Sequence, residues 1–160
     1  NGFFRHATFD LSNHFEENIL VIEKYRPGKV YSAVYWDAEQ KFYYLKRFMI
    51  EESEKPLCFI DEHPDSRLIS LTEVEYPRFE IHFGGKHKNR ENEIIEVAGF
   101  IGVKSYKAKG KRLTSFTVEN IQEIEPVLKK ENPAVEPLKN EDEEPSPPAH
   151  DDPAQMKLEL

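Results

Sequence analysis

The chain has 160 residues, which is enough for one domain of ordinary size or for a small domain with an extension. Its net charge of −8, its apolar content of 38% and its 11 prolines indicate that part of it does not pack into a core. The single cysteine, Cys58, excludes an intramolecular disulfide and a cysteine-cluster metal site. No apolar run approaches the roughly 18 residues of a membrane span, and no signal peptide is visible.

Stretches rich in β-branched and aromatic residues alternate along the chain with turn residues, a pattern typical of β-strands. The predicted strands are residues 18–25, 29–37, 41–50, 67–74, 78–85, 93–100 and 111–118. The breaks contain Pro27-Gly28, Asp37-Ala38-Glu39-Gln40, Pro64-Asp65, Gly84-Gly85 and Lys109-Gly110. A helical turn is expected at most within residues 11–19. The predicted fold class is therefore all-β, with antiparallel strands.

A faint internal repeat suggests how these strands are grouped. A shift of 49 residues places residues 19–35 on residues 68–84, strand on strand and turn on turn. Three or four strands per unit of about 50 residues is typical of propeller-like blades, which cannot bury their faces alone. We predict antiparallel propeller-like blades, about two to three of them, over residues 1–125.

The composition changes near Pro126. Residues 126–160 contain nine acidic residues, four lysines and no aromatic residue, which gives this tail a charge of −5 and leaves −3 for residues 1–125. Such a segment buries too little apolar surface to offset its chain entropy. We predict a disordered acidic tail over residues 126–160, able to compete with an anionic ligand for nearby lysines at low salt.

Positive charge is concentrated just before the end of the predicted domain. The segment 103–112 contains Lys104, Lys107, Lys109, Lys111 and Arg112, and no acid follows until Glu119. Gly110 can adopt positive φ in a tight turn and so present these side chains along one edge. A strip of cations binds DNA phosphates without reading sequence. The alternative is that the cations solubilise an edge strand and discourage sheet-to-sheet pairing.

Two smaller basic groups could extend the same surface. A hairpin turn at Gly84-Gly85 would project Lys86, Lys88 and Arg90. Strand alternation places Lys46 and Arg47 on opposite faces, so at most one of that pair faces any given surface.

No pattern of catalytic residues is visible. The six histidines include no pair at the i, i+4 spacing of a helical metal site, and there is no Gly-rich phosphate loop. The tyrosines all fall in or beside predicted strands. We expect residues 1–160 to be non-catalytic, without a cofactor or metal of their own.

Three stretches carry a resemblance to a known family: AVYWDAEQKFYYLKRFMIE (33–51), YPRFEIHFGG (76–85) and EVAGFIGVKSYKAKGKRLTSFTVENIQEIEP (96–126). They resemble the C-terminal region of bacterial type IIA topoisomerase A subunits, of the topoisomerase IV or gyrase A kind. The resemblance implies a β-pinwheel of four-stranded blades whose basic rim binds and bends duplex DNA, here with two or three of the usual five or six blades. The gyrase Gln-Arg-Arg-Gly-Gly-Lys-Gly box is absent, and KAKGKR (107–112) is the nearest match, which favours a topoisomerase IV-like role.

The resemblance also implies partners. These are duplex DNA, the remainder of the topoisomerase A subunit and its ATPase B subunit, in the bacterial cytoplasm near the nucleoid. ATP and Mg²⁺ would be used by other domains or subunits of the parent enzyme. The alternative from a different class is a propeller-like protein-interaction module whose basic surface meets an acidic partner.

Overall fold

The computed structural model describes residues 2–127, and almost all of the regular structure in them is β. The elements are β1 (Phe3–Phe4), β2 (Val30–Asp37), β3 (Phe42–Met49), β4 (Leu57–Cys58), β5 (Arg67–Thr72), β6 (Arg78–Phe83), the 3-10 turn η1 (Gly85–His87), β7 (Glu93–Glu96), the one-turn helix α1 (Val97–Phe100), β8 (Val103–Ser105), β9 (Lys111–Arg112) and β10 (Val118–Ile124). The prediction of an all-β, antiparallel, blade-like fold is confirmed. In residues 2–127 no helix is long and apolar enough to cross a membrane.

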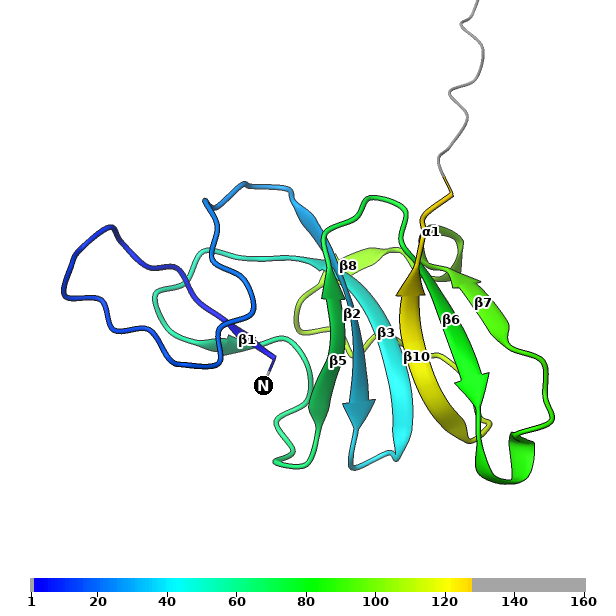
Figure 1. Cartoon of the computed structure of the whole chain (residues 1–160). Coiled ribbons are helices and arrows are strands. Elements are labelled where there is room, and N and C mark those ends of the chain that lie inside the picture. The colour runs from blue at the N-terminus through cyan, green and yellow to red at the C-terminus, as the bar shows by residue number, and fades with distance from the viewer. Residues whose placement is uncertain (1, 128–160) are drawn as a thin grey trace, which may run out of the picture. The chain divides into compact units, whose positions relative to one another are not determined.

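The strands form two main sheets, which we call blades. The first blade has the order β5-β2-β3, and the second blade has the order β10-β6-β7 (Figure 1). The outer edge of β3 is lined by β8 and β9. A short antiparallel pair, β1-β4, forms a third sheet. β8 runs parallel to β3, whereas the other pairings are antiparallel. Each blade is thus built around a hairpin, β2-β3 or β6-β7, and a third strand that returns to pair with the first.

Two apolar cores cover the two faces of the first blade. The inter-blade core consists of Val34, Leu45, Phe79, Ile81, Phe83, Ile95, Val97, Ile101, Leu113 and Ile121. The outer core consists of Tyr31, Ala33, Phe48, Phe59 and Tyr106, with Phe4 and Leu57 of the β1-β4 pair packed against it. Because β2 and β3 contribute to both cores, they are buried on both faces, whereas β6 shows the simple in-out alternation predicted for Phe79, Ile81 and Phe83.

Three predicted strands differ from the structure. Residues 93–100 pair only as far as Glu96, because β6 begins at Arg78 after Pro77; the chain then turns into α1, where Ile101 N–H donates to the Val97 carbonyl. The predicted strand 111–118 divides into β9 and β10, since the chain crosses from the first blade to the second between them. These segments have strand-like composition, but a strand ends where its partner ends.

The third difference is the predicted strand 18–25, which forms no strand. It lies in an irregular stretch between β1 and β2, and no strand of the described residues pairs with it. The expected helical turn in residues 11–19 is also absent; a turn is closed by Asn13 N–H donating to the Asp10 carbonyl at 3.1 Å, without helix. The predicted tail, beyond Val127, lies outside the described residues.

Candidate nucleic-acid interface

The basic edge segment, which we define as residues 103–112, lies along the free edge of β3. β8 pairs with Arg47 through Met49, and β9 pairs with Tyr44 and Leu45, so the intervening residues bulge away from the sheet as a loop. Gly110 adopts φ +93°, as predicted, and a Cβ at this position would lie 2.5 Å from the Leu45 carbonyl oxygen. Glycine is therefore required both for the turn and for the close approach of β9 to β3.

Buried polar groups hold the loop of the basic edge segment in place. The ammonium of Lys46 donates to the Phe59 carbonyl at 2.5 Å and also to the Tyr106 carbonyl. The hydroxyl of Tyr35 donates to the Lys109 carbonyl, and burial raises the pKa of this phenol, so it stays a donor. The Tyr106 ring itself enters the outer core. The loop is thus fixed by its backbone and by one aromatic side chain, which leaves its cationic side chains free to project.

Lys109 is the exception among those cations. Its ammonium lies 2.6 Å from Oδ2 of Asp37, whose side chain is fully buried. Burial alone would raise the pKa of Asp37, but the Gln40 backbone N–H and the Lys109 ammonium more than offset it and hold the pKa below the ordinary value. The contact between the Lys109 ammonium and the Asp37 carboxylate likewise raises the pKa of Lys109. Lys109 therefore neutralises a buried carboxylate and is less available to an external anion than its neighbours.

The other four cations of the segment are exposed and have no carboxylate partner within residues 2–127: Lys104, Lys107, Lys111 and Arg112. Two of them rest on aromatic rings, Lys111 over Phe100 at 4.1 Å and Arg112 over Phe42 at 4.5 Å. In both contacts the charged group itself lies over the ring, and the Lys111 ammonium also donates to the Phe100 carbonyl at 3.4 Å, so these two cations are partly engaged within the domain although they remain exposed. All four of these predicted residues lie on segments that follow the same edge of β3, which we call the cationic edge, but Lys111, opposite Leu45, and Arg112, opposite Tyr44, point to opposite faces of the sheet.

The prediction that Lys46 belongs to a basic surface is wrong. Its side chain is 2% exposed, because β3 is covered on both faces and Lys46 points toward the outer core. Desolvation lowers its pKa to about 8. Arg47, on the opposite face, is half-buried, and its Nε is enclosed without a hydrogen-bond partner among the described residues. Neither side chain extends the cationic edge.

The group that follows Gly84-Gly85 is exposed but belongs to a different place in the fold. Lys86 and Lys88 lie in and after η1, on the connection from β6 to β7. Arg90 stacks over the Phe116 ring at 3.8 Å, so its guanidinium is engaged in a contact within the second blade. The connection is joined to the start of β10, since Gly84 N–H donates to the Thr117 carbonyl. These residues form a second, smaller basic group.

Sequence reasoning missed the residues that support the edge. Asp37 was predicted only as part of a turn, and its Oδ1 does accept from Gln40 N–H at 2.8 Å in the β2-β3 hairpin. No local signal marks its pairing with Lys109, or the role of Tyr35, because these partners are more than 70 residues apart in the chain. Within residues 2–127 no cluster of three or more His, Cys, Asp or Glu side chains could hold a metal ion.

Comparisons with known proteins agree with this picture at the level of the family. Neither the curated proteins nor the solved structures include a match to the chain. A family model described as the topoisomerase C-terminal domain of Bacteroidota matches residues 1–125, which includes both blades and the whole basic edge segment. The chain therefore belongs to the Bacteroidota topoisomerase C-terminal domain family.

Proposed function

We propose that residues 1–125 bind duplex DNA without sequence preference, as an accessory domain of a type II topoisomerase A subunit. The observation that carries this proposal is the group of four exposed cations on the basic edge segment that have no carboxylate partner within residues 2–127. It stands out because residues 1–125 have a net charge of −3, so the edge is a local concentration of positive charge on an acidic domain. Family membership supplies the context in which a DNA ligand is expected.

The chemistry of the edge suits phosphate contact. Duplex DNA carries one negative charge about every 1.7 Å along its axis, and each neutralised phosphate releases counterions. Three of the four cations are lysines, which act as mobile point charges, whereas bidentate base recognition generally uses arginine. The loop between β8 and β9 is fixed by buried hydrogen bonds, so little backbone ordering is needed on binding.

The sequence of the basic edge segment favours one kind of topoisomerase over the other. With one glycine in residues 107–112 and no gyrase box, the domain suits a topoisomerase IV-like role, in which it holds DNA during strand passage, better than tight wrapping. In this proposal the rest of the A subunit and an ATPase B subunit perform the ATP-dependent and Mg²⁺-dependent steps in the bacterial cytoplasm. The exposed lysines of η1 and its flank would add a second, weaker contact.

Charge removal tests the proposal. Replacing Lys104, Lys107, Lys111 and Arg112 with alanine should weaken binding about equally for unrelated duplexes. It should reduce the slope of log K against log[salt] by about 0.9 for each phosphate that the variant no longer neutralises. A matched control replaces four exposed cations elsewhere in the domain: Lys24, Arg26, Lys55 and Arg67. If both variants bind alike at low salt, the cationic edge is not the DNA-binding surface.

Duplex length separates DNA binding from the protein-interaction alternative. A domain that holds DNA along an edge should gain affinity as the duplex grows from roughly 10 to 40 base pairs, whereas a surface built for an acidic protein gains no more than the statistical increase in sites. Fluorescence anisotropy with labelled duplexes at fixed salt measures this. Affinity that is independent of length would favour the protein-interaction module.

A further inference from the structure

Residues 18–23 present an unusual apolar surface. Four consecutive aliphatic side chains, Ile19 to Ile22, are between 40% and 70% exposed. Their composition is that of a strand, yet no strand within residues 2–127 pairs with them. A contiguous exposed apolar segment of this kind marks an interaction site, and the two blades indicate what should occupy it.

The two blades repeat the same strand pairing at a fixed offset. In the first blade Ser32 pairs with Thr72, and in the second blade Ile81 pairs with Ile121; both partners are displaced by 49 residues. The neighbouring pair, Ala33 with Leu71, likewise recurs as His82 with Asn120. An irregularity in register follows within two residues in both blades. The repeat therefore joins the first strand of each blade, β2 or β6, to its third strand, β5 or β10.

Subtracting the same 49 residues from the positions of β5 gives residues 18–23. Leu68, Ile69 and Leu71 of β5 correspond to Ile19, Leu20 and Ile22. In β5 these side chains are half-buried: Ile69 packs against the inter-blade core, and Leu68 and Leu71 pack against the outer core. Residues 18–23 thus have the side chains of a third strand and lack the first strand that would pair with them.

The outer core is smaller than the inter-blade core and has no full blade covering it within residues 2–127. The inter-blade core contains ten buried residues and lies between two full blades. The outer core, on the other face of the first blade, contains five and is covered by the short β1-β4 pair and by Tyr106. Leu20 corresponds to Ile69 of β5. The Ile69 side chain packs against the inter-blade core, whereas Leu20 is 70% exposed.

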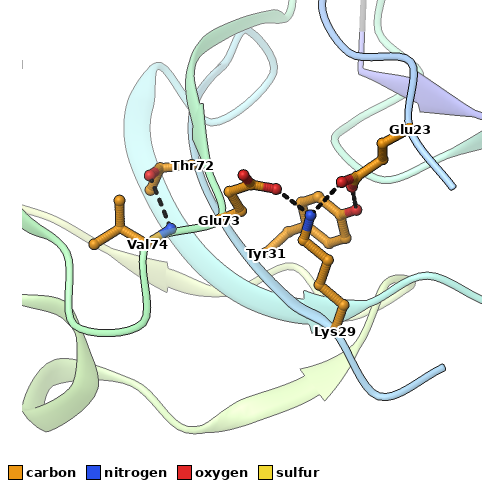
Figure 2. Close-up of polar contacts among 6 residues, drawn as sticks. All are labelled: Glu23, Lys29, Tyr31, Thr72, Glu73 and Val74. Atoms are coloured by element: carbon orange, nitrogen blue, oxygen red, sulfur yellow. Dashed lines mark hydrogen bonds and ion pairs between the residues drawn. The ribbon is translucent and has the colours of Figure 1, made fainter. Parts of the chain in front are cut away.

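A polar network fixes one end of the segment (Figure 2). Glu23 accepts hydrogen bonds from Lys29 at 2.5 Å and from the Tyr31 hydroxyl, while Lys29 also binds Glu73 just after β5. The Lys29 hydrogen bond lowers the pKa of Glu23, and burial, then the bond to Glu23, raises the pKa of Tyr31 to about 12. Glu23 and Lys29 therefore both stay charged across the neutral pH range, and the Tyr31 hydroxyl stays a hydrogen-bond donor.

A related contact, to a backbone carbonyl and not to a carboxylate, occurs in the second blade. Arg78 lies 49 residues after Lys29, and its Nε donates to the Glu125 carbonyl just after β10 at 2.8 Å. In both blades a basic residue at or just before the start of the first strand therefore binds a residue just after the third strand. Lys29 makes one additional contact, to Glu23 at the end of residues 18–23.

We infer that residues 18–23 are the third strand of a further blade, in which they pair antiparallel with a strand equivalent to β2. The occupant is another blade of the same repeat, supplied by the parent topoisomerase subunit. Its first strand would satisfy the backbone of residues 18–23, and its apolar face would complete the outer core over Leu20. The inference rests on the proposed function only in placing this domain within a larger subunit, and DNA binding plays no part in it.

Hydrogen exchange, measured without DNA, tests the inference. Amides of residues 18–23 should exchange rapidly in the 160-residue chain and at least about 100-fold more slowly in the full-length subunit, as expected on entering a sheet. Equally rapid exchange in both proteins would overturn the inference. Slow, concentration-dependent exchange in the 160-residue chain would also overturn it, because a second copy would then supply the partner strand. Neither outcome depends on whether the cationic edge binds DNA.

A pair of matched variants adds a second readout. Leu20→Asn with Ile22→Asn should leave the melting temperature of the 160-residue chain unchanged but lower that of the full-length subunit and abolish protection of residues 18–23. The control, Phe9→Asn with Leu11→Asn, alters two residues that are each 103% exposed in the same irregular stretch but correspond to neither the first nor the third strand of a blade. If the two double variants behave alike in the full-length subunit, the assigned strand is wrong.

Discussion

The buried ammonium of Lys46 makes the stability of this domain depend on pH in a way that a methionine at the same position would remove. Lys46 is enclosed between β3 and the outer core, and its two hydrogen-bond partners are neutral carbonyls. Desolvation without a carboxylate partner lowers its pKa from 10.5 to about 8. Lys46→Met keeps the length and apolar character of the stem and removes the titrating group.

The sign and size follow from linkage. Between pH 8 and 10.5 the unfolded chain holds the proton on Lys46 and the folded chain releases it, so folded-state stability rises with pH across this window. Since each pKa unit corresponds to about 1.4 kcal/mol, the charged ammonium costs about 3 kcal/mol below pH 8, and the cost disappears above 10.5. The variant leaves two carbonyls without a donor, at about 1–3 kcal/mol each. The two effects are therefore of similar size at pH 7.

Urea unfolding at a series of pH values measures the difference. We expect the free energy of unfolding of the parent chain, relative to Lys46→Met, to increase by about 3 kcal/mol between pH 7 and 10.5. Both proteins should carry Cys58→Ser, because burial raises the pKa of that thiol and its titration would overlap. Lys55→Met, at an exposed position, is the control and should show no such trend. A difference that stays flat with pH would refute the argument that Lys46 is desolvated.

Three other changes have defined outcomes. Gly110→Ala should lower the free energy of unfolding by at least about 2 kcal/mol and weaken DNA binding, because the new Cβ meets a β3 carbonyl at 2.5 Å in a positive-φ turn. Gly102→Ala, with open space around it, should be nearly neutral, and equal melting temperatures of the two variants would contradict this. Asp37→Asn should lower stability at pH 7 but lose less stability than the parent chain on acidification below pH 4, since the lowered pKa of the Asp37 carboxyl stabilises the fold above that range. The same variant should free Lys109 to contact DNA, and a fall in DNA affinity would contradict this second expectation. Truncation after Glu125 removes a charge of −5 and should tighten DNA binding at low salt, with the gain shrinking as salt rises; identical titrations would exclude competition by the tail.

Local chemistry in the sequence was enough to predict most strands and the turn of the basic edge. The predicted strands 78–85 and 29–37 correspond to β6 and β2 to within two residues at each end, because alternation and β-branched, aromatic composition reflect side-chain direction on a pleated strand. The positive φ of Gly110 was likewise predictable, since few other residues tolerate it. The 49-residue offset was visible in the sequence as well.

Only the tertiary structure decided which of these patterns have partners. Lys46 and Lys111 are both strand lysines, yet one is buried by a second layer over β3 and the other lies on a free edge. Lys109 differs from its neighbours because a buried carboxylate 72 residues away reaches it. Residues 18–25 have strand composition but no strand, because backbone pairing needs a neighbour that composition does not supply. Burial and pairing arise from segments far apart in the chain, so a local pattern can propose them but long-range contacts determine them.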